Sequence, residues 1–219
     1  MLVVDRLSKQ YERAGRPLVL FKDLSFSLKH TDRLGILGRN GQGKSTLIKI
    51  LGGVTAPTAG KVRWSMKASW PLGFGGAFQG GLTGIDNIRF IARIYSQPFG
   101  PLFDRVERFA ELGDALSTPV KHYSSGMRAR LAFGLSLGID FDCYLIDEVI
   151  SVGDALFREK CENELFGKLA DQSFIIASHD MDFMRRTCNC ALVINSGVFE
   201  WHDDLDTAIE SYEEICRVE

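Results

Sequence analysis

Short runs of apolar residues recur along this chain and predict buried strands. The runs at 34–37, 143–146 and 173–177 are continuous, and each is too short to form a helix by itself. Two further runs, 191–194 and 198–201, lie on either side of a turn signal and predict a pair of closing strands. Strands of this kind, separated by helical stretches, indicate an α/β fold.

Between these strands, residues 83–138 show a helical spacing of apolar positions, with isoleucines three residues apart from Ile88 to Ile94. We interpret this stretch as an inserted helical subdomain. The remaining residues, about 1–82 and 139–219, then form the core and a β subdomain of one single domain that spans 1–219.

The N-terminal part gives weaker signals. Residues 2–4 predict a short strand, and residues 18–21 and 24–28 predict two more. Tyr11 lies in a polar, glycine-containing segment that ends at Pro17. Its position is equally consistent with a ring that lies against a nucleotide base and with a surface or hairpin tyrosine.

The strand at 34–37 leads into a segment that fits G-x-x-x-x-G-K-[ST] at every fixed position. The segment, called the phosphate loop below, consists of Gly38, Arg39, Asn40, Gly41, Gln42, Gly43, Lys44, Ser45 and Thr46. A helical run over 47–51 follows and stops at a pair of glycines. Strand, glycine-rich loop and helix in this order predict phosphate binding.

Each part of the phosphate loop suits a nucleoside triphosphate. Its glycines let the backbone turn N–H groups toward phosphate oxygens, and the following helix adds its positive N-terminal dipole. The ammonium group of Lys44 can contact the β- and γ-phosphates, and the hydroxyl group of Ser45 can bind Mg²⁺. We therefore expect the chain to bind a nucleoside triphosphate together with Mg²⁺.

Polar residues also follow two later strands. Asp147 and Glu148 come directly after the strand at 143–146. Beside a phosphate loop, one carboxylate can hold Mg²⁺ and the other can accept a proton from an attacking water. His179 follows the strand at 173–177, so it is expected at the crevice in which open α/β sheets bind their ligands.

Two further segments allow two interpretations each. Gln79 lies among the five glycines between Gly73 and Gly81, either as part of a moving loop or as a solvated amide. Ser124, Ser125 and Gly126 open a helix, which is consistent with a second phosphate site or with simple capping.

Composition excludes several classes of protein. The chain has 219 residues, a net charge of −2 and a pI near 6.1, so it lacks the basic bias of a nucleic-acid-binding protein. Its five cysteines are scattered without the spacing of a zinc site. No apolar run approaches the roughly 18 residues of a membrane span, and residues 1–6 lack the apolar h-region that is typical of a signal peptide. If the protein acts at a membrane, we expect another chain to cross it.

Six segments occur in an order that resembles the ATP-binding cassette (ABC) ATPases along the whole chain. They are the phosphate loop, the segment with Gln79, the helical insertion, Tyr123-Ser124-Ser125-Gly126-Met127, Leu145-Ile146-Asp147-Glu148 and Ser178-His179-Asp180. The resemblance implies a P-loop NTPase with a RecA-like mixed sheet, an antiparallel β subdomain and an inserted helical subdomain. Within the family, segments 123–131 and 147–154 are similar to the ATPases of polysaccharide exporters. Segment 73–84 is similar to the capsular-polysaccharide branch in particular, which includes the exporters of polysialic acid.

The resemblance implies ATP as the nucleotide and gives the candidate residues roles in its hydrolysis. Tyr11 would stack on adenine, and Asp147 would orient Mg²⁺ together with Ser45. Glu148 would polarise the attacking water, and His179 would contact the γ-phosphate and the facing subunit.

The same resemblance implies that two copies enclose two nucleotides. Ser124, Ser125 and Gly126 would contact the ATP of the partner copy, and residues 151–154 would couple the two sites. Gln79 aligns with a glutamine that contacts Mg²⁺ in the family.

The sequence also departs from the family pattern. Tyr123 and Met127 replace the leucine and the glutamine of the common Leu-Ser-Gly-Gly-Gln segment, and Val149 replaces a frequent proline.

We therefore expect an ATPase whose homodimer drives two copies of a membrane permease, with further export-complex proteins, at the cytoplasmic face of the inner membrane. The expected cargo is capsular polysaccharide, and the expected permease contact lies near 78–95. Three alternatives remain open: an exporter of O-antigen or teichoic acid, a soluble ABC ATPase without a transport role, and a P-loop phosphotransferase.

Overall fold

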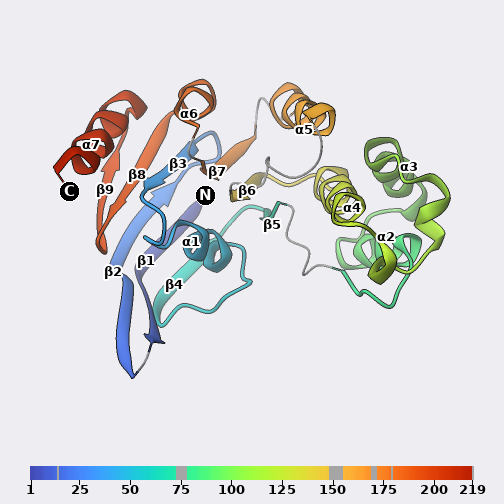
Figure 1. The fold of residues 1–219 in the computed structure, drawn as a ribbon, viewed down its shortest axis with the longest axis horizontal. Helices are drawn as coiled ribbons and strands as arrows, with labels where there is room; N and C mark the ends of the chain where they lie inside the picture. The colour runs from blue at the N-terminus through green and yellow to red at the C-terminus, as the bar shows by residue number, and fades with distance from the viewer. Residues whose placement is uncertain (14, 73–77, 148–154, 169–171, 179, 219) are drawn as a thin grey trace. The chain divides into compact units, whose positions relative to one another are not determined.

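The computed structural model describes residues 1–13, 15–72, 78–147, 155–168, 172–178 and 180–218 (Figure 1). The strands are β1 (Leu2–Arg13), β2 (Arg16–Leu28), β3 (Arg33–Gly38), β4 (Ala59–Trp64), β5 (Ala68–Pro71), β6 (Cys143–Asp147), β7 (Ser173–Ala177), β8 (Cys190–Asn195) and β9 (Val198–His202). The helices are α1 (Lys44–Leu51), α2 (Gly84–Ile94), α3 (Phe99–Ala110), α4 (Ser125–Gly138), α5 (Ala155–Lys168), α6 (Met181–Thr187) and α7 (Leu205–Val218). Two 3₁₀ turns, Gly113–Ser117 and Val120–His122, lie between α3 and α4.

These elements form two compact units. The first contains Met1–Pro71, Phe141–Glu148 and Asp171–Glu219, and the second contains Leu72–Asp140 and Val149–Ala170. Both sheets belong to the first unit, while helices α2 to α5 belong to the second. We call them the core unit and the helical unit.

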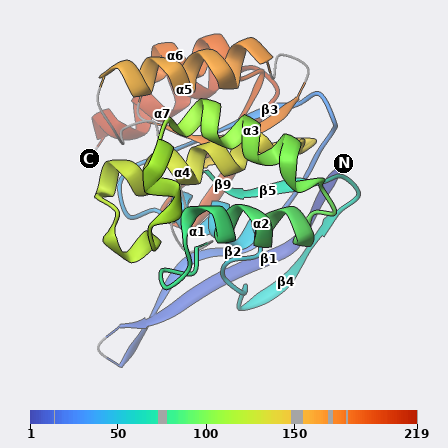
Figure 2. The ribbon, with the colours of Figure 1, turned by 90° about the vertical axis from the view of Figure 1, so that its right-hand side faces the viewer.

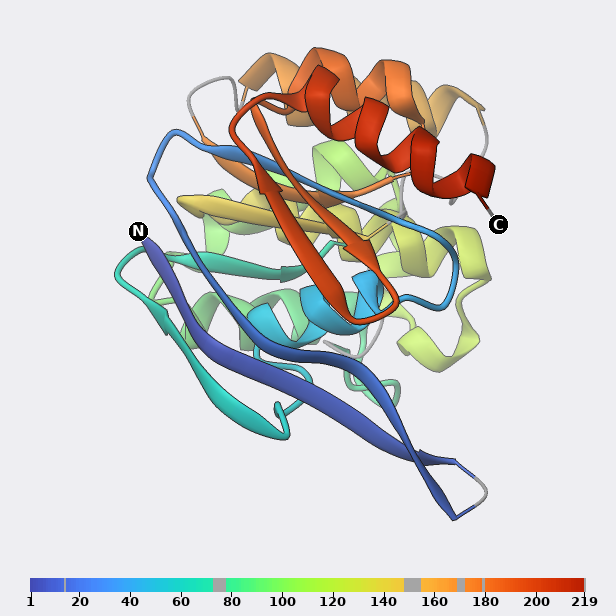
Figure 3. The ribbon, with the colours of Figure 1, turned by 90° about the vertical axis from the view of Figure 1, so that its left-hand side faces the viewer.

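The core unit is built on a six-stranded sheet in the order β5-β6-β7-β3-β8-β9. All neighbouring pairs are parallel except β8 and β9, which form an antiparallel hairpin. Strands β3, β6, β7 and β8 are buried along almost their whole length, as expected for parallel strands that are covered on both faces. Figure 3 shows α1 below this sheet and α6 and α7 above it.

A second, three-stranded antiparallel sheet, ordered β2-β1-β4, completes the core unit. Its buried residues, among them Leu2, Phe21 and Leu28, join one hydrophobic cluster with α1 and the six-stranded sheet. The tyrosine ring of Tyr144 and the side chain of Phe174 are also fully buried in this unit. Burial of this apolar surface is the main force that holds the two sheets together.

Strand β1 is longer than the sequence indicated. The apolar run predicted a short strand at 2–4, but β1 continues to Arg13 and pairs with β2 as far as Arg16. Residues 10–12 are exposed, so no apolar pattern marks this part of the strand. Cross-strand backbone pairing forms it instead, with Tyr11 opposite Leu18.

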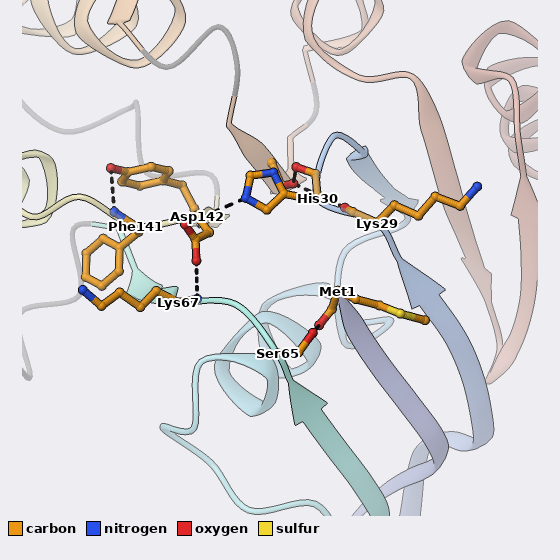
Figure 4. A network of polar contacts seen from close by, with 9 residues as sticks. Met1, Lys29, His30, Ser65, Lys67, Phe141 and Asp142 are labelled. Atoms are coloured by element: carbon orange, nitrogen blue, oxygen red, sulfur yellow. Dashed lines mark hydrogen bonds and ion pairs between the residues drawn. The ribbon is translucent and has the colours of Figure 1, made fainter.

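A polar network at the opposite end of the parallel strands aligns their starts. Figure 4 shows Asp142 between His30 and the backbone of Lys67. Its Oδ2 accepts a hydrogen bond from the Lys67 backbone N–H at 2.7 Å, and its Oδ1 lies 3.8 Å from His30 Nε2. The backbone carbonyl of Asp142 accepts from the N–H of Ser173 at 3.2 Å. Asp142 thereby links the segments that precede β5, β6 and β7.

In the helical unit, α2, which is labelled in Figure 2, has one buried face. Ile88 and Ile91 are buried as the spacing predicted, but Ile94 is 56% exposed, so its placement on the same face was wrong. At the start of the helix Gly84 is crowded: a Cβ there would lie 2.6 Å from Tyr123 Oη and 2.8 Å from Leu116 Cδ2. Only glycine fits this contact without displacing its neighbours.

Helix α5 is attached to the helical unit by a lysine that caps α3. Lys160 Nζ donates to Phe109 O at 3.0 Å and to a carboxylate oxygen of Glu111 at 2.5 Å. A cation at the C-terminus of a helix is favourable because it meets unpaired carbonyl groups there. This hydrogen bond and the charge of Lys160 lower the pKa of Glu111.

Two glycines near helix starts give a matched test of packing in the helical unit. Gly84→Ala should lower the free energy of unfolding by about 1–3 kcal/mol, because the new methyl group overpacks the contact with Tyr123 and Leu116. Gly100 on α3 has open space around it, so Gly100→Ala should stabilise the protein by about 0.5–1 kcal/mol through its helix propensity. Urea denaturation measures both, and equal effects of the two substitutions would contradict this packing.

Candidate nucleotide-binding site

The phosphate loop lies between β3 and α1, as the sequence predicted. Gly41 and Gly43 adopt φ angles of 84° and 99°, which residues with a side chain rarely adopt. Gly43 is also the N-cap of α1, so the first free N–H groups of the helix lie in the loop. The buried Lys44 donates through Nζ to Gly38 O at 2.5 Å and to Arg39 O at 3.2 Å.

Asp147 meets the phosphate loop across the sheet edge. Ser45 Oγ donates a hydrogen bond of 2.7 Å to Asp147 Oδ1, although 102 positions separate the two residues. The parallel strands β6 and β3 are both paired with β7, so Asp147 and Ile36 each lie opposite Ala177 in register. The carboxyl ends of the three strands therefore share one edge, where ligands bind in open α/β sheets.

Tyr11 also belongs to this site. A pocket of about 340 Å³ joins the hairpin of β1 and β2 to the phosphate loop. Its lining residues are Tyr11, Leu18, Leu20, Asn40, Gly41, Gly43, Lys44, Ser45 and Thr46. The tyrosine side chain is 43% exposed, and Lys9 Nζ lies 4.6 Å from its ring centre. The pocket thus combines polar atoms of the loop with an aromatic ring and two leucines.

Three contributors to this site were missed by the sequence reasoning. Leu18 and Leu20 were assigned to a strand, but nothing in their spacing connected them with the loop. The backbone N–H of Ser196, in the turn between β8 and β9, donates to Gln42 Oε1 at 2.9 Å and so fixes the tip of the loop. The turn itself was predicted from its sequence, but its contact with Gln42 gives no local signal.

Ser124 and Gln79 lie in the helical unit. Ser124 caps α4: its Oγ accepts a hydrogen bond from the N–H of Met127 at 3.1 Å. Ser124 and Ser125 are exposed and Gly126 is half-buried. Gln79 is exposed as well. Capping is therefore present in the structure, and a phosphate-binding role for this helix start stays a prediction.

Several predicted residues lie outside the described part of the chain. They are Glu148, Ser151, Gly153, Asp154 and His179. Described residues immediately precede both segments, because Asp147 ends β6 and Ser178 follows β7.

The described residues also bear on metal binding, thiol reactivity and membrane spanning. They contain no group of three or more His, Cys, Asp or Glu residues placed to hold a metal ion. The thiol of Cys143 is buried in the core unit, and this burial raises its pKa to about 12. A thiol with this pKa stays protonated and inert at neutral pH. Among the described helices, none combines the length and the apolar character that crossing a membrane requires.

The geometry defines a P-loop nucleotide-binding fold, and comparisons with known proteins identify its family. The pattern of the ABC transporter family matches residues 21–151. The chain is 51% identical over 213 residues to the capsule polysaccharide export ATP-binding protein CtrD of Neisseria meningitidis serogroup B, covering 97% of this chain and 98% of CtrD. The chain therefore belongs to the ABC transporter family.

A second relative and a solved structure are also similar to the chain. It is 49% identical over 214 residues to the ATP-binding protein BexA of Haemophilus influenzae, covering 98% of this chain and 99% of BexA. A solved ATP-binding subunit of an ABC transporter superposes with a TM-score of 0.74 at 20% identity, covering 97% of this chain and 99% of the other, which shows the shared fold. The predicted fold class and the resemblance to capsule exporter ATPases are thereby confirmed.

The pocket makes a prediction about Tyr11. Tyr11→Ala should weaken ATP binding about 5- to 150-fold, since stacking of a base on an aromatic ring contributes about 1–3 kcal/mol. Tyr11→Phe keeps the ring and should bind ATP like the wild type. Binding of inorganic tripolyphosphate, which has no base, should be equal in all three proteins. Isothermal titration measures these affinities, and equal ATP binding by Tyr11→Ala would remove the stacking role.

Proposed function

We propose that this chain is the ATP-binding and ATP-hydrolysing subunit of an ABC exporter that drives capsular polysaccharide across the inner membrane through a separate permease. The nucleotide part rests on the pocket that joins Tyr11 to the phosphate loop. The cargo rests on similarity, over almost the whole chain, to CtrD, a protein named for capsule polysaccharide export.

ATP fits both the polar and the apolar residues that line the pocket. The adenine ring would lie against Tyr11 and Leu18, while the phosphates would receive hydrogen bonds from the backbone N–H groups of the loop. The ammonium group of Lys44 already lies within the loop and would neutralise part of the phosphate charge.

The residues at the sheet edge also fit Mg²⁺. This ion prefers hard oxygen donors and is usually held by one or two carboxylates or hydroxyl groups together with phosphates. The oxygen atoms Ser45 Oγ and Asp147 Oδ1 lie 2.7 Å apart, and both could bind the ion. Gln79 is the third candidate ligand. When bound, the ion would supply positive charge that orients the phosphates.

Hydrolysis requires a base near the γ-phosphate. We assign this role to Glu148, which follows Asp147 directly and would take the proton of the attacking water. His179 follows Ser178 after β7 and would hold the γ-phosphate through its imidazole.

The active form in this proposal is a homodimer. Ser124, Ser125 and Gly126 of one copy would close over the phosphates bound by the other. Ser124 and Ser125 are exposed at the start of α4, which leaves them accessible to a partner. Residues 151–154 would couple the two sites. The domain boundaries near 82 and 138 stay part of this proposal.

The dimer would act on two copies of a permease, with further export proteins, at the cytoplasmic face of the inner membrane. The permease contact is proposed at 78–95, where Leu82, Phe90 and Ile94 are 39%, 45% and 56% exposed. Exposed apolar side chains that gather in one segment are typical of a protein contact. With a net charge of −2, no nucleic-acid partner is proposed.

A deletion strain tests the function and its dependence on ATP. Loss of the gene should remove capsule from the cell surface and leave polysaccharide inside the cell. The wild-type gene should restore surface capsule, and Lys44→Ala should fail because the loop loses its phosphate-binding cation. Lys49 lies in the last turn of the same helix. Lys49→Ala is therefore the matched control and should restore capsule.

The amount of capsule on the cell surface is measured in strains that contain equal amounts of the ATPase protein. Restoration by Lys44→Ala would refute the ATP-driven role. Unchanged capsule in the deletion strain would show that the cargo is a different one.

A further inference from the structure

A buried asparagine interrupts the apolar face of α2. Asn87 is 0% exposed and lies on the same face as Gly84, Ile88 and Ile91, which are all buried. A buried amide destabilises a protein unless its hydrogen-bonding groups find partners. The side chain of Asn87 therefore needs a specific set of contacts.

The backbone around Gln79 provides these contacts. The N–H of Gln79 donates to Asn87 Oδ1 at 2.9 Å, and Asn87 Nδ2 donates to Gln79 O at 3.2 Å. Asn87 Nδ2 also donates to Thr83 O at 2.9 Å. Asn87 thus pairs with both backbone groups of Gln79, as a neighbouring strand would, and fixes this residue against α2.

The segment after Gln79 is held from its other side by the chain that leads to α4. The N–H of Lys121 donates to Gly80 O at 2.9 Å, and the N–H of Val120 donates to Leu82 O at 2.9 Å. From Lys121 the chain reaches Ser124, the N-cap of α4, within three residues.

Tyr123 stabilises the same junction. Its hydroxyl group donates to Ala115 O at 2.6 Å and lies where Gly84 has no side chain. Burial raises the pKa of Tyr123, so the hydroxyl group stays protonated and keeps donating this hydrogen bond. Gln79 and Ser124 therefore belong to one hydrogen-bonded piece of the helical unit.

We propose that Asn87 is a positioning residue for ATP hydrolysis: its buried amide fixes the backbone of Gln79 in register with the segment that presents Ser124. Asn87 itself touches no nucleotide and acts through Gln79. The two residues that the proposed mechanism directs at phosphate or Mg²⁺, Gln79 and Ser124, are then held at a fixed spacing within the helical unit. This inference rests on the proposed function, since Gln79 matters only if the chain hydrolyses ATP.

A double-mutant cycle tests whether Asn87 acts through Gln79. Turnover of ATP by the purified full chain is measured for wild type, Gln79→Ala, Asn87→Ala and the double variant, at a temperature where all four are folded. Each single substitution should lower kcat by about tenfold, and the double variant should be no slower than Gln79→Ala. ATP affinity should change less than about twofold in every variant, because the pocket lies in the core unit.

A matched control separates positioning from simple loss of stability. Ser136 is another fully buried polar residue of the helical unit, and its Oγ donates to Ala132 O at 2.9 Å, away from Gln79. Ser136→Ala should lower Tm by a few degrees and leave kcat unchanged. If Asn87→Ala does not fold, Asn87→Ser takes its place in the cycle, since a serine is too short to reach both groups of Gln79.

Effects on kcat that multiply in the double variant would overturn the proposal, as would an unchanged kcat in folded Asn87→Ala. If Gln79→Ala keeps full turnover, both the proposal and the role of Gln79 are wrong. Failure of the proposed function is distinguishable from these outcomes, because the wild-type chain would then show no ATP turnover.

Discussion

Parallel pairing of β6 and β3 with β7 is the constraint on which the candidate site depends. It brings Asp147 to the same sheet edge as the phosphate loop and allows the 2.7 Å hydrogen bond from Ser45. Apolar packing between α1 and the buried strands holds this edge in place. The hydrogen bonds of Asp142 align the opposite ends of the strands. A shift of one residue in either pairing would move Asp147 away from the loop and turn its side chain to the other face of the sheet.

The sequence was most informative where a short pattern has one physical solution. Gly43 is a fixed glycine of the phosphate-loop motif, and its φ angle of 99° favours glycine, so the motif and the structure agree there. The carboxyl-end position of Asp147 follows from its place after a buried strand. The length of β1 and the contact between Gln42 and Ser196 were not predictable, because both depend on pairing between distant segments of polar residues. No pattern in the sequence singles out Asn87, and only its burial in the structure distinguishes it.

Two polar contacts stabilise the helical unit, and they differ in the free energy that each contributes. The contact of Lys160 with Glu111 lies at the surface, where ion pairs contribute about 0–1 kcal/mol. The amide of Asn87 is fully buried, and removal of its partners would leave a polar group without hydrogen bonds at a cost of about 1–3 kcal/mol. The buried contacts of Asn87 therefore stabilise the helical unit more than the surface contact of Lys160 does. Because Asn87 binds it, the segment from Gln79 to Thr83 is the better-ordered connection to α4.

We propose that the phosphate loop forms half of a site and that Ser124 of a second copy completes it. Sedimentation of Glu148→Gln with MgATP tests this most directly, because a chain that binds ATP without turnover should accumulate in the closed state. We expect a dimer with MgATP, a monomer with MgADP, and a monomer in both nucleotides when Ser124→Arg is added. A Glu148→Gln chain that binds MgATP and stays monomeric would contradict the claim.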